Sequence, residues 1–215
     1  MTSLQSSGLA RRGDSAEPRQ RILEAAVHLF ADRGFDGVTL RSIGAAVGLH
    51  NSTLFHHFRN KREIASSAFE CVLERLLPCL RSVEEDDPPC LDRFVSCAEE
   101  LLDHFATHRD DARFLGRALL DQDTFLHDYV RSVDRGDTRH PLVRGFSIVW
   151  GWLDRARRTG AIRPVRVFPA TRILIGILIF EPSYETPERA EHVAARKEEI
   201  AHFIRSALRP EVRAT

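Results

Sequence analysis

The sequence predicts an all-α protein with a small N-terminal three-helix domain followed by a larger helical domain. Apolar residues recur at spacings of three and four along most of the chain, which is the helical period. No segment alternates with period two over a useful length, and the one short candidate, residues 162–168, contains a proline that cannot donate to a sheet. We expect a disordered arm over residues 1–17, a first domain over 18–62 and a second over 63–210.

The composition is that of a soluble globular protein. Of the 215 residues, 43% are hydrophobic and 29% are charged, which is too apolar for a disordered chain and enough for a sizeable core. The longest unbroken apolar run, residues 173–180, is far shorter than the ~20 residues of a membrane-spanning helix. The polar N-terminus lacks the apolar segment of a secretory signal. We therefore expect a cytoplasmic protein that does not cross a membrane.

The four cysteines form no C-x-x-C pair, and no histidine is spaced from them as in a zinc site. Cys71, Cys79, Cys90 and Cys97 are interpreted as reduced, small apolar residues of helices. A redox sensor or an unusual metal site is the alternative. No cofactor is predicted.

Two helices open the first domain. One runs from about residue 18 to residue 33, where Gly34 permits a left-handed stop and Phe35 adds an apolar residue just beyond it. The next, over residues 40–47, follows Thr39, whose hydroxyl can accept from free N–H groups of the first turn.

A third, shorter helix follows Gly48 and the polar residues 50–53. Asn60 and Glu63 then have the spacing of a helix cap, and apolar positions continue a fourth helix to about Pro78. We expect this long fourth helix to connect the two domains.

The second domain begins with a loop and continues as helices. Residues 83–89 are charged and contain a proline pair, which is typical of a loop. Longer amphipathic stretches follow at residues 91–108, 112–134, 141–159, 168–180 and 187–208.

The net charge of zero hides an asymmetry along the chain. Residues 1–62 carry nine Lys and Arg against five Asp and Glu, whereas residues 63–215 carry twenty-two against twenty-six. A basic first quarter followed by an acidic remainder indicates that the N-terminal part meets a polyanion. The alternative is a solvated basic face, because so small an excess can arise by chance.

The second and third helices have the arrangement of a helix-turn-helix. Such a motif needs two short helices joined at a tight bend, so that the second projects while the first braces it. The expected apolar wedge consists of Ile43, Val47, Leu49, Leu54 and Phe58. The polar residues between them then lie on the outer side.

At these residues the sequence resembles the tetracycline-repressor-like (TetR) transcription regulators. The match runs through R-I-L-E-A-A-x-x-L-F-A-x-x-G-F-D-G-V-T-L-R-S-I-G-A-A-V-G-L and then T-L-F-H-H-F-R-N-K-R-E-I, covering residues 21–64. The resemblance implies that residues 53–58 belong to a DNA recognition helix and that Lys61 contacts a backbone phosphate. The DNA-binding residues expected on this basis are Thr39, Arg41, His50, Asn51, Ser52, Thr53, Phe55, His56, His57 and Lys61.

Two residues depart from the family pattern. Phe55 stands where the family usually has a tyrosine, so a hydroxyl that commonly meets phosphate is missing. His50 takes the place of a serine or threonine cap at the start of the third helix. Both departures concern the DNA contacts and leave the fold unaffected.

The resemblance implies a small-molecule pocket and a two-fold dimer interface in the second domain. Candidate pocket residues are Phe94, Cys97, Leu101, Phe105, Phe114, Phe125, Phe146, Val149 and Trp150, with Trp150, Phe146 and Phe105 converging on one volume. The same residues would equally serve a solid core. Candidate interface residues are Ile173, Ile175, Ile177, Phe180 and Phe203, for which an internal core helix is the alternative.

No motif indicates an enzyme. The sequence has no G-x-S-x-G elbow, no phosphate-cradling glycine loop and no H-E-x-x-H. His104 and His108 are four apart, a spacing that can hold a metal, but no third ligand stands out and no metal site is predicted.

We expect a homodimeric repressor that binds palindromic double-stranded DNA and is released by a small, largely apolar effector. The alternative is a helical protein-interaction module, or a regulator that a protein partner controls and that has no small-molecule ligand.

Overall fold

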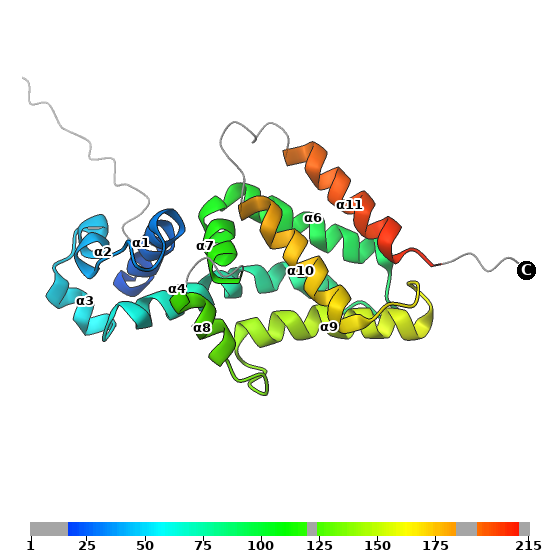
Figure 1. The fold of residues 1–215 in the computed structure, drawn as a ribbon, viewed down its shortest axis with the longest axis horizontal. Coiled ribbons are helices and arrows are strands. Elements are labelled where there is room, and N and C mark those ends of the chain that lie inside the picture. The colour runs from blue at the N-terminus through cyan, green and yellow to red at the C-terminus, as the bar shows by residue number, and fades with distance from the viewer. Residues whose placement is uncertain (1–16, 120–123, 184–192, 211–215) are drawn as a thin grey trace, which may run out of the picture.

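The computed structural model describes residues 17–119, 124–183 and 193–210, and every regular element in these ranges is helical. Figure 1 shows an elongated molecule with the first three helices at one end and a helical bundle at the other. The fourth helix runs from the first group into the second. An all-α fold with two lobes is therefore as predicted, while the domain boundary at residues 62 and 63 stays a prediction.

The first lobe contains α1 (Pro18–Arg33), α2 (Leu40–Val47) and α3 (Asn51–His57), and α4 (Lys61–Leu76) leads out of it. α1 and α2 have the bounds expected from the sequence. Gly34 ends α1 with a φ of 70° and a ψ of 174°, a region that favours glycine but is not the left-handed helical conformation predicted.

Local capping explains where α2 and α4 begin. The Thr39 hydroxyl accepts from the Ser42 N–H at 3.1 Å, and the Ser42 hydroxyl accepts from the Thr39 N–H at 3.0 Å. At α4 the Asn60 side-chain oxygen Oδ1 accepts from the Glu63 N–H at 2.9 Å. Both helix starts agree with the prediction made from these residues.

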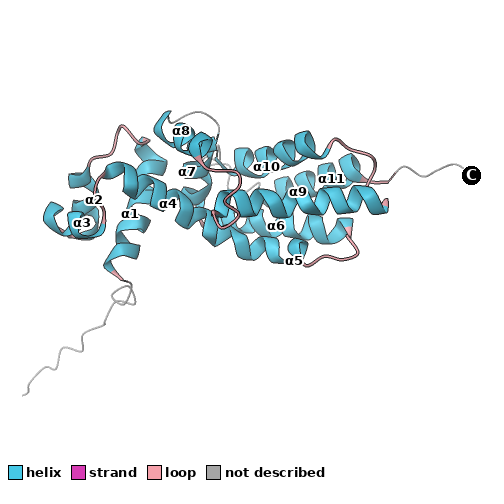
Figure 2. Cartoon of the chain, turned by 90° about the horizontal axis from the view of Figure 1, so that it is seen from below, coloured by secondary structure: helices cyan, strands magenta, loops and turns pink. Residues whose placement is uncertain are grey.

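The second lobe holds the remaining helices. They are a 3₁₀ turn η1 (Leu77–Leu80), α5 (Arg81–Glu84), α6 (Leu91–Thr107), α7 (Arg109–Leu119), α8 (Thr124–Ser132), α9 (Pro141–Thr159), α10 (Val167–Ser183) and α11 (Val193–Leu208). Figure 2 shows α6, α9, α10 and α11 running side by side as a bundle, with α5 at its edge.

Two sequence predictions for this lobe need correction, and a third is not tested. The stretch 112–134, predicted as one helix, is described as two, α7 and α8, because apolar periodicity alone does not mark a helix end. The expected loop 83–89 starts later, since Val83 and Glu84 complete α5 and Val83 is buried. The last helix is described only from Val193, so the predicted start at residue 187 lies outside the described residues.

One continuous apolar core joins the two lobes. It extends from Ile22 of α1 through Phe69 of α4 to Ile204 of α11, all fully buried. None of the described helices is both long enough and apolar enough to cross a membrane.

Candidate nucleic-acid interface

The helix-turn-helix is braced by buried apolar residues and one arginine. Ile43 of α2, Leu54 of α3 and Phe58 are buried, as the wedge prediction requires. The chain turns at Gly48, which has a φ of 70°, and the Leu49 N–H donates to the Gly44 carbonyl at 2.8 Å. Together these contacts fix the direction of α3 against α2.

Arg21 of α1 closes the end of α2. Its guanidinium donates to the Val47 carbonyl at 3.1 Å. The last carbonyls of a helix have no partner within the helix, so a cation there supplies both a donor and a favourable charge. Local sequence patterns carry no sign of this role, because the two residues are 26 positions apart.

The outer face of α3 presents a mixed polar and aromatic surface. Ser52 and His56 are exposed, Thr53 and His57 are half-buried, and the Phe55 side chain is 53% exposed. The Asn51 side chain lies outside the described part of the structure. The predicted contact residues that are described are thus open to solvent on the side away from Leu54.

Three further predicted contact residues flank α3. Thr39 and Arg41, at the start of α2, are exposed, and Arg41 forms no hydrogen bond or ion pair with any described residue. His50 is exposed and its side chain makes no cap bond to α3. All three are available to a ligand that approaches this end of the molecule.

Lys61 has a structural role that was not anticipated. Its ammonium donates to the Phe35 carbonyl at 2.8 Å and to the Val38 carbonyl at 2.9 Å, and it lies 4.0 Å from the centroid of the Phe35 ring. It therefore ties the α1–α2 connection to the first turn of α4. An ammonium has three N–H donors, so one remains for phosphate, and the phosphate contact of Lys61 stays a prediction.

Helix α7 holds α1 through one side of its surface. Asp110 lies 2.8 Å from His28, Phe114 stacks on Phe30, and Arg117 donates to the Ala31 carbonyl at 2.9 Å and the Asp32 carbonyl at 3.2 Å. Positions 110, 114 and 117 share a helix face. This face couples the second lobe directly to the first.

A buried carboxylate ties α7 to its other neighbours. Asp111 is 2% exposed, and its oxygens lie 3.0 Å from Arg75 of α4 and 3.1 Å from His104 of α6. Burial alone would lower the Arg75 pKa, because it disfavours the charged guanidinium. The nearby Asp111 carboxylate and Cys71 have the opposite effect, which is larger when combined, so the Arg75 pKa is raised above its ordinary value. The result is a paired buried charge at the junction of three helices.

His104 and His108 stack on each other with centroids 4.4 Å apart. The His104 ring lies 3.1 Å from Asp111, and the His108 ring lies 3.2 Å from the His104 backbone carbonyl. Both imidazoles therefore have polar partners within the protein. Within the described residues no three His, Cys, Asp or Glu side chains gather as a metal site would require.

Most of the candidate pocket residues belong to the apolar core. Phe94 stacks on Trp152 at 4.3 Å, and the Cys97 thiol donates to the Cys79 carbonyl at 3.2 Å. Phe125 stacks on Phe35 of the first lobe at 4.3 Å. Leu101, Phe105, Phe114 and Val149 are buried, while Phe146 is half-buried and packs edge-on against Phe168 at 6.1 Å.

The predicted convergence of Trp150 with Phe146 and Phe105 stays a prediction. Trp150 is 45% exposed, whereas Phe105 is 2% exposed. The buried tryptophan is Trp152, whose indole N–H donates to Asp86 at 2.8 Å. Two residues along a helix turn the side chain through about 200°, which reverses inside and outside.

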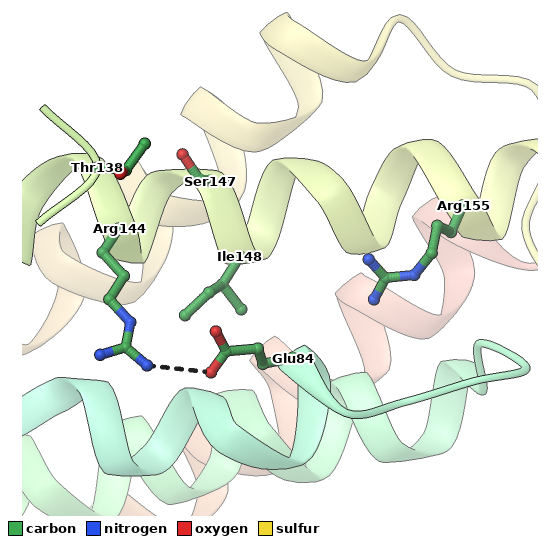
Figure 3. A pocket seen from close by; sticks show the side chains of 6 residues that line it. All are labelled: Glu84, Thr138, Arg144, Ser147, Ile148 and Arg155. Atoms are coloured by element: carbon green, nitrogen blue, oxygen red, sulfur yellow. Dashed lines mark hydrogen bonds and ion pairs between the residues drawn. The ribbon is translucent and has the colours of Figure 1, made fainter. Parts of the chain in front are cut away.

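An open hollow of about 350 Å³ lies between α5 and α9 (Figure 3). It is lined by Glu84, Thr138, Arg144, Ser147, Ile148 and Arg155, and none of these was predicted as a ligand residue. Arg144 lies 3.4 Å from Glu84 within it. Five of its six lining residues are polar or charged and it is open to solvent, unlike the enclosed apolar pocket expected.

Two thiols of the second lobe, those of Cys79 and Cys97, are poorly suited to reaction. Burial raises the Cys97 pKa to about 12, with Glu100 and Cys79 adding to the effect. Burial likewise raises the Cys79 pKa. These two residues behave as apolar core side chains.

The candidate dimer residues divide between surface and core. Ile173 of α10 is 56% exposed and Phe203 of α11 is 48% exposed, whereas Ile175 and Ile177 are half-buried. The Phe180 side chain lies outside the described residues. Phe168 of α10 is also exposed, so α10 presents more than one apolar side chain to solvent.

Comparison with known proteins identifies the first lobe. Residues 22–68 match the model of the "Bacterial regulatory proteins, tetR family". The biofilm operon icaADBC HTH-type negative transcriptional regulator IcaR of Staphylococcus aureus is 31% identical over 58 residues, which are 27% of this chain and 31% of IcaR. The match thus spans about a third of the length of that relative.

Solved structures share the fold over most of the chain. The fatty acid degradation regulator FadR from Bacillus halodurans has a TM-score of 0.73 at 16% identity, over 91% of this chain and 99% of FadR. The TetR family regulator PfmR from Thermus thermophilus has a TM-score of 0.69 at 22% identity, over 93% and 100%. Residues 22–68 thus match the tetR family of bacterial regulatory proteins, and the solved structures show that the chain as a whole shares their fold.

Proposed function

We propose that the protein is a transcription regulator, not an enzyme, that binds double-stranded DNA through α3 and represses transcription as a homodimer. The observation that carries the proposal is the division of α3 into a buried side, Leu54, and an exposed side with Ser52, Phe55 and His56. A recognition helix must present side chains to base edges while its other side is fixed in the domain. The word "negative" in the name of IcaR supports repression.

Positive charge near α3 supports the approach of DNA. Arg41 and Arg59 are exposed beside the two ends of the helix-turn-helix, and Lys61 begins α4. Such residues contact phosphates and set the register of the protein on the duplex, whereas α3 itself reads bases. The proposed division is backbone contacts from α2 and α4 and base contacts from α3.

The homodimer is proposed to form through α10 and α11. Ile173 and Phe203 expose large apolar side chains on these helices, and a two-fold contact would remove both from water. A dimer also accounts for recognition of a palindrome, because two recognition helices about 34 Å apart enter successive major grooves.

An effector is proposed to act through α7. This helix contacts α1 through Phe114 and Arg117 and contacts α4 through Asp111. A molecule that favours a different position of α7 would move the first lobe, provided that it binds one arrangement more tightly than the other. The name of FadR refers to fatty acid degradation, so fatty acids are suitable first candidates for a largely apolar effector.

DNA selection tests the proposal. The full chain is incubated with random duplexes, bound DNA is enriched, and the selected site is titrated at several salt concentrations. We expect a palindromic site and an affinity that falls steeply with salt, because phosphate contacts release counterions. Failure to enrich any sequence would contradict DNA recognition.

Effector response needs a separate measurement. A fatty acid panel is screened by thermal shift, since a molecule that binds the native state raises its melting temperature. Each hit is then tested for release of the selected DNA. Stabilisation without release would argue against the proposed effector class, while leaving DNA binding intact.

A further inference from the structure

Phe55 is an exposed aromatic side chain that folding does not explain. It lies in α3, and 53% of it is open to solvent. The neighbours Leu54 and Phe58 are the apolar residues that enter the core. No ring contact or cation–π contact joins Phe55 to another described residue, so its apolar surface is free to meet another molecule.

The chemistry of Phe55 limits what it can meet on DNA. Its ring has no hydrogen-bond donor or acceptor, so it cannot bind a phosphate oxygen as a tyrosine hydroxyl could. In the major groove the apolar group presented by the bases is the 5-methyl group of thymine, and phenylalanine is among the side chains that contact it.

The composition of α3 also favours an apolar contact with thymine. The segment Asn51–His57 contains neither lysine nor arginine, so the commonest specific contact, a bidentate bond from arginine or lysine to guanine, is not available from this helix. Apolar contact therefore has more weight in what α3 reads.

We propose that Phe55 is a specificity-determining residue that packs against the 5-methyl group of a thymine in each half-site. This inference rests on the proposed DNA-binding function and names part of the base sequence that the protein selects. Each half-site accordingly contains one thymine whose methyl group strengthens binding. This contribution is separate from any hydrogen bonds to the edge of the same base.

Removal of single methyl groups from DNA tests the inference. In the selected site each thymine is replaced in turn by deoxyuridine, which keeps base pairing and loses only the methyl. For the wild-type chain we expect one position per half-site at which affinity falls about fourfold, as for one buried methyl group. Deoxyuridine at the same position should not change the DNA affinity of the Phe55→Ala variant. That variant already binds the thymine site more weakly than the wild-type chain does.

Two controls make the result specific. His56→Ala changes a neighbouring exposed residue and should retain the deoxyuridine effect. A cytosine placed at the critical position should weaken binding of the wild-type chain, and 5-methylcytosine there should recover part of the loss because it restores a methyl group at the same place. Phe55→Ala should not distinguish these two bases.

Clear outcomes would overturn the proposal. Selected sites without a critical thymine, or a deoxyuridine effect of equal size in wild type and Phe55→Ala, would exclude the contact. In both cases the wild-type chain has still selected DNA, so the proposed function stands. If no DNA is selected at all, the proposed function itself fails.

Discussion

Phe114 of α7 stacks on Phe30 of α1, with ring centroids 5.8 Å apart and planes inclined by 16°. Both side chains are fully buried, although one belongs to the lobe with the helix-turn-helix and the other to the second lobe. The two lobes therefore share a core, and the position of α1 depends on that of α7.

Phe114→Ala should destabilise the whole protein by roughly 3–5 kcal/mol, as expected for a phenylalanine removed from a close-packed core. Because the core is continuous, unfolding should remain a single transition in circular dichroism. Phe203→Ala, at an exposed phenylalanine, is the control if it is studied at concentrations where the chain is monomeric. Separate melting of two lobes would show that they do not share a cooperative core.

Lys61→Met should lower both stability and DNA affinity. The variant keeps the aliphatic stem but loses the donors to the Phe35 and Val38 carbonyls, which we expect to cost about 1–3 kcal/mol in chemical denaturation. If Lys61 also contacts phosphate, the slope of log affinity against log salt falls by about one, equally for selected and random DNA.

A salt slope unchanged by Lys61→Met, together with a lower melting temperature, would assign Lys61 a purely structural role. Loss of sequence preference at constant slope would contradict the phosphate contact. Arg62→Met is a useful comparison, since the neighbouring Arg62 lies 5.6 Å from the centroid of the Phe125 ring and makes neither carbonyl contact.

Arg117→Met should loosen α1 from α7. Its guanidinium satisfies the Ala31 and Asp32 carbonyls at the end of α1, which have no partner within that helix. We expect a loss of about 1–3 kcal/mol in stability and faster hydrogen exchange in the last turn of α1. Arg113→Met, at an exposed residue of the same helix, should leave both unchanged.

Ile173→Asp should give a folded monomer. Ile173 is exposed in the single chain, so the change should not disturb the fold, whereas a carboxylate inside an apolar interface costs several kcal/mol. Sedimentation velocity measures the oligomeric state. Trp150→Asp changes an exposed residue of α9 outside the predicted interface and should leave the dimer intact; a dimeric Ile173→Asp chain would move the interface elsewhere.

Thiol labelling should distinguish the cysteines at pH 8. The raised pKa values of Cys79 and Cys97 keep both protonated there, and only the thiolate reacts rapidly. With iodoacetamide and mass spectrometry we expect modification of the exposed Cys90 first, and of Cys97 only after denaturation. Rapid labelling of Cys97 in the native protein would indicate an open second lobe.

Sequence patterns are most informative where local interactions decide the structure. α1 and α2 have the bounds predicted, because a helix start such as that at Thr39 depends on residues three positions apart. The separation of α7, which ends at Leu119, from α8, which starts at Thr124, is not predicted, because apolar periodicity continues along this part of the sequence.

Contacts between distant residues cannot be predicted in the same way. Lys61 meets carbonyls that precede it by 23 and 26 positions, and Arg117 meets carbonyls more than 80 positions away. On α9 the periodicity allows either Trp150 or Trp152 in the core, and only packing decides that Trp152 is the buried one. Within the candidate site, the sequence motif predicts one feature, the exposure of the outer face of α3.

The contact between α7 and α1 has a consequence for building hybrid regulators. A DNA-binding head taken from this protein and joined to another regulatory domain at the start of α4 would leave behind Asp110, Phe114 and Arg117, and with them the partners of His28, Phe30 and the end of α1. Such a chimera would expose the Phe30 ring and lose the contacts between α7 and α1. A working exchange of DNA-binding domains therefore requires that the α7 residues that contact α1 be transferred together with α1.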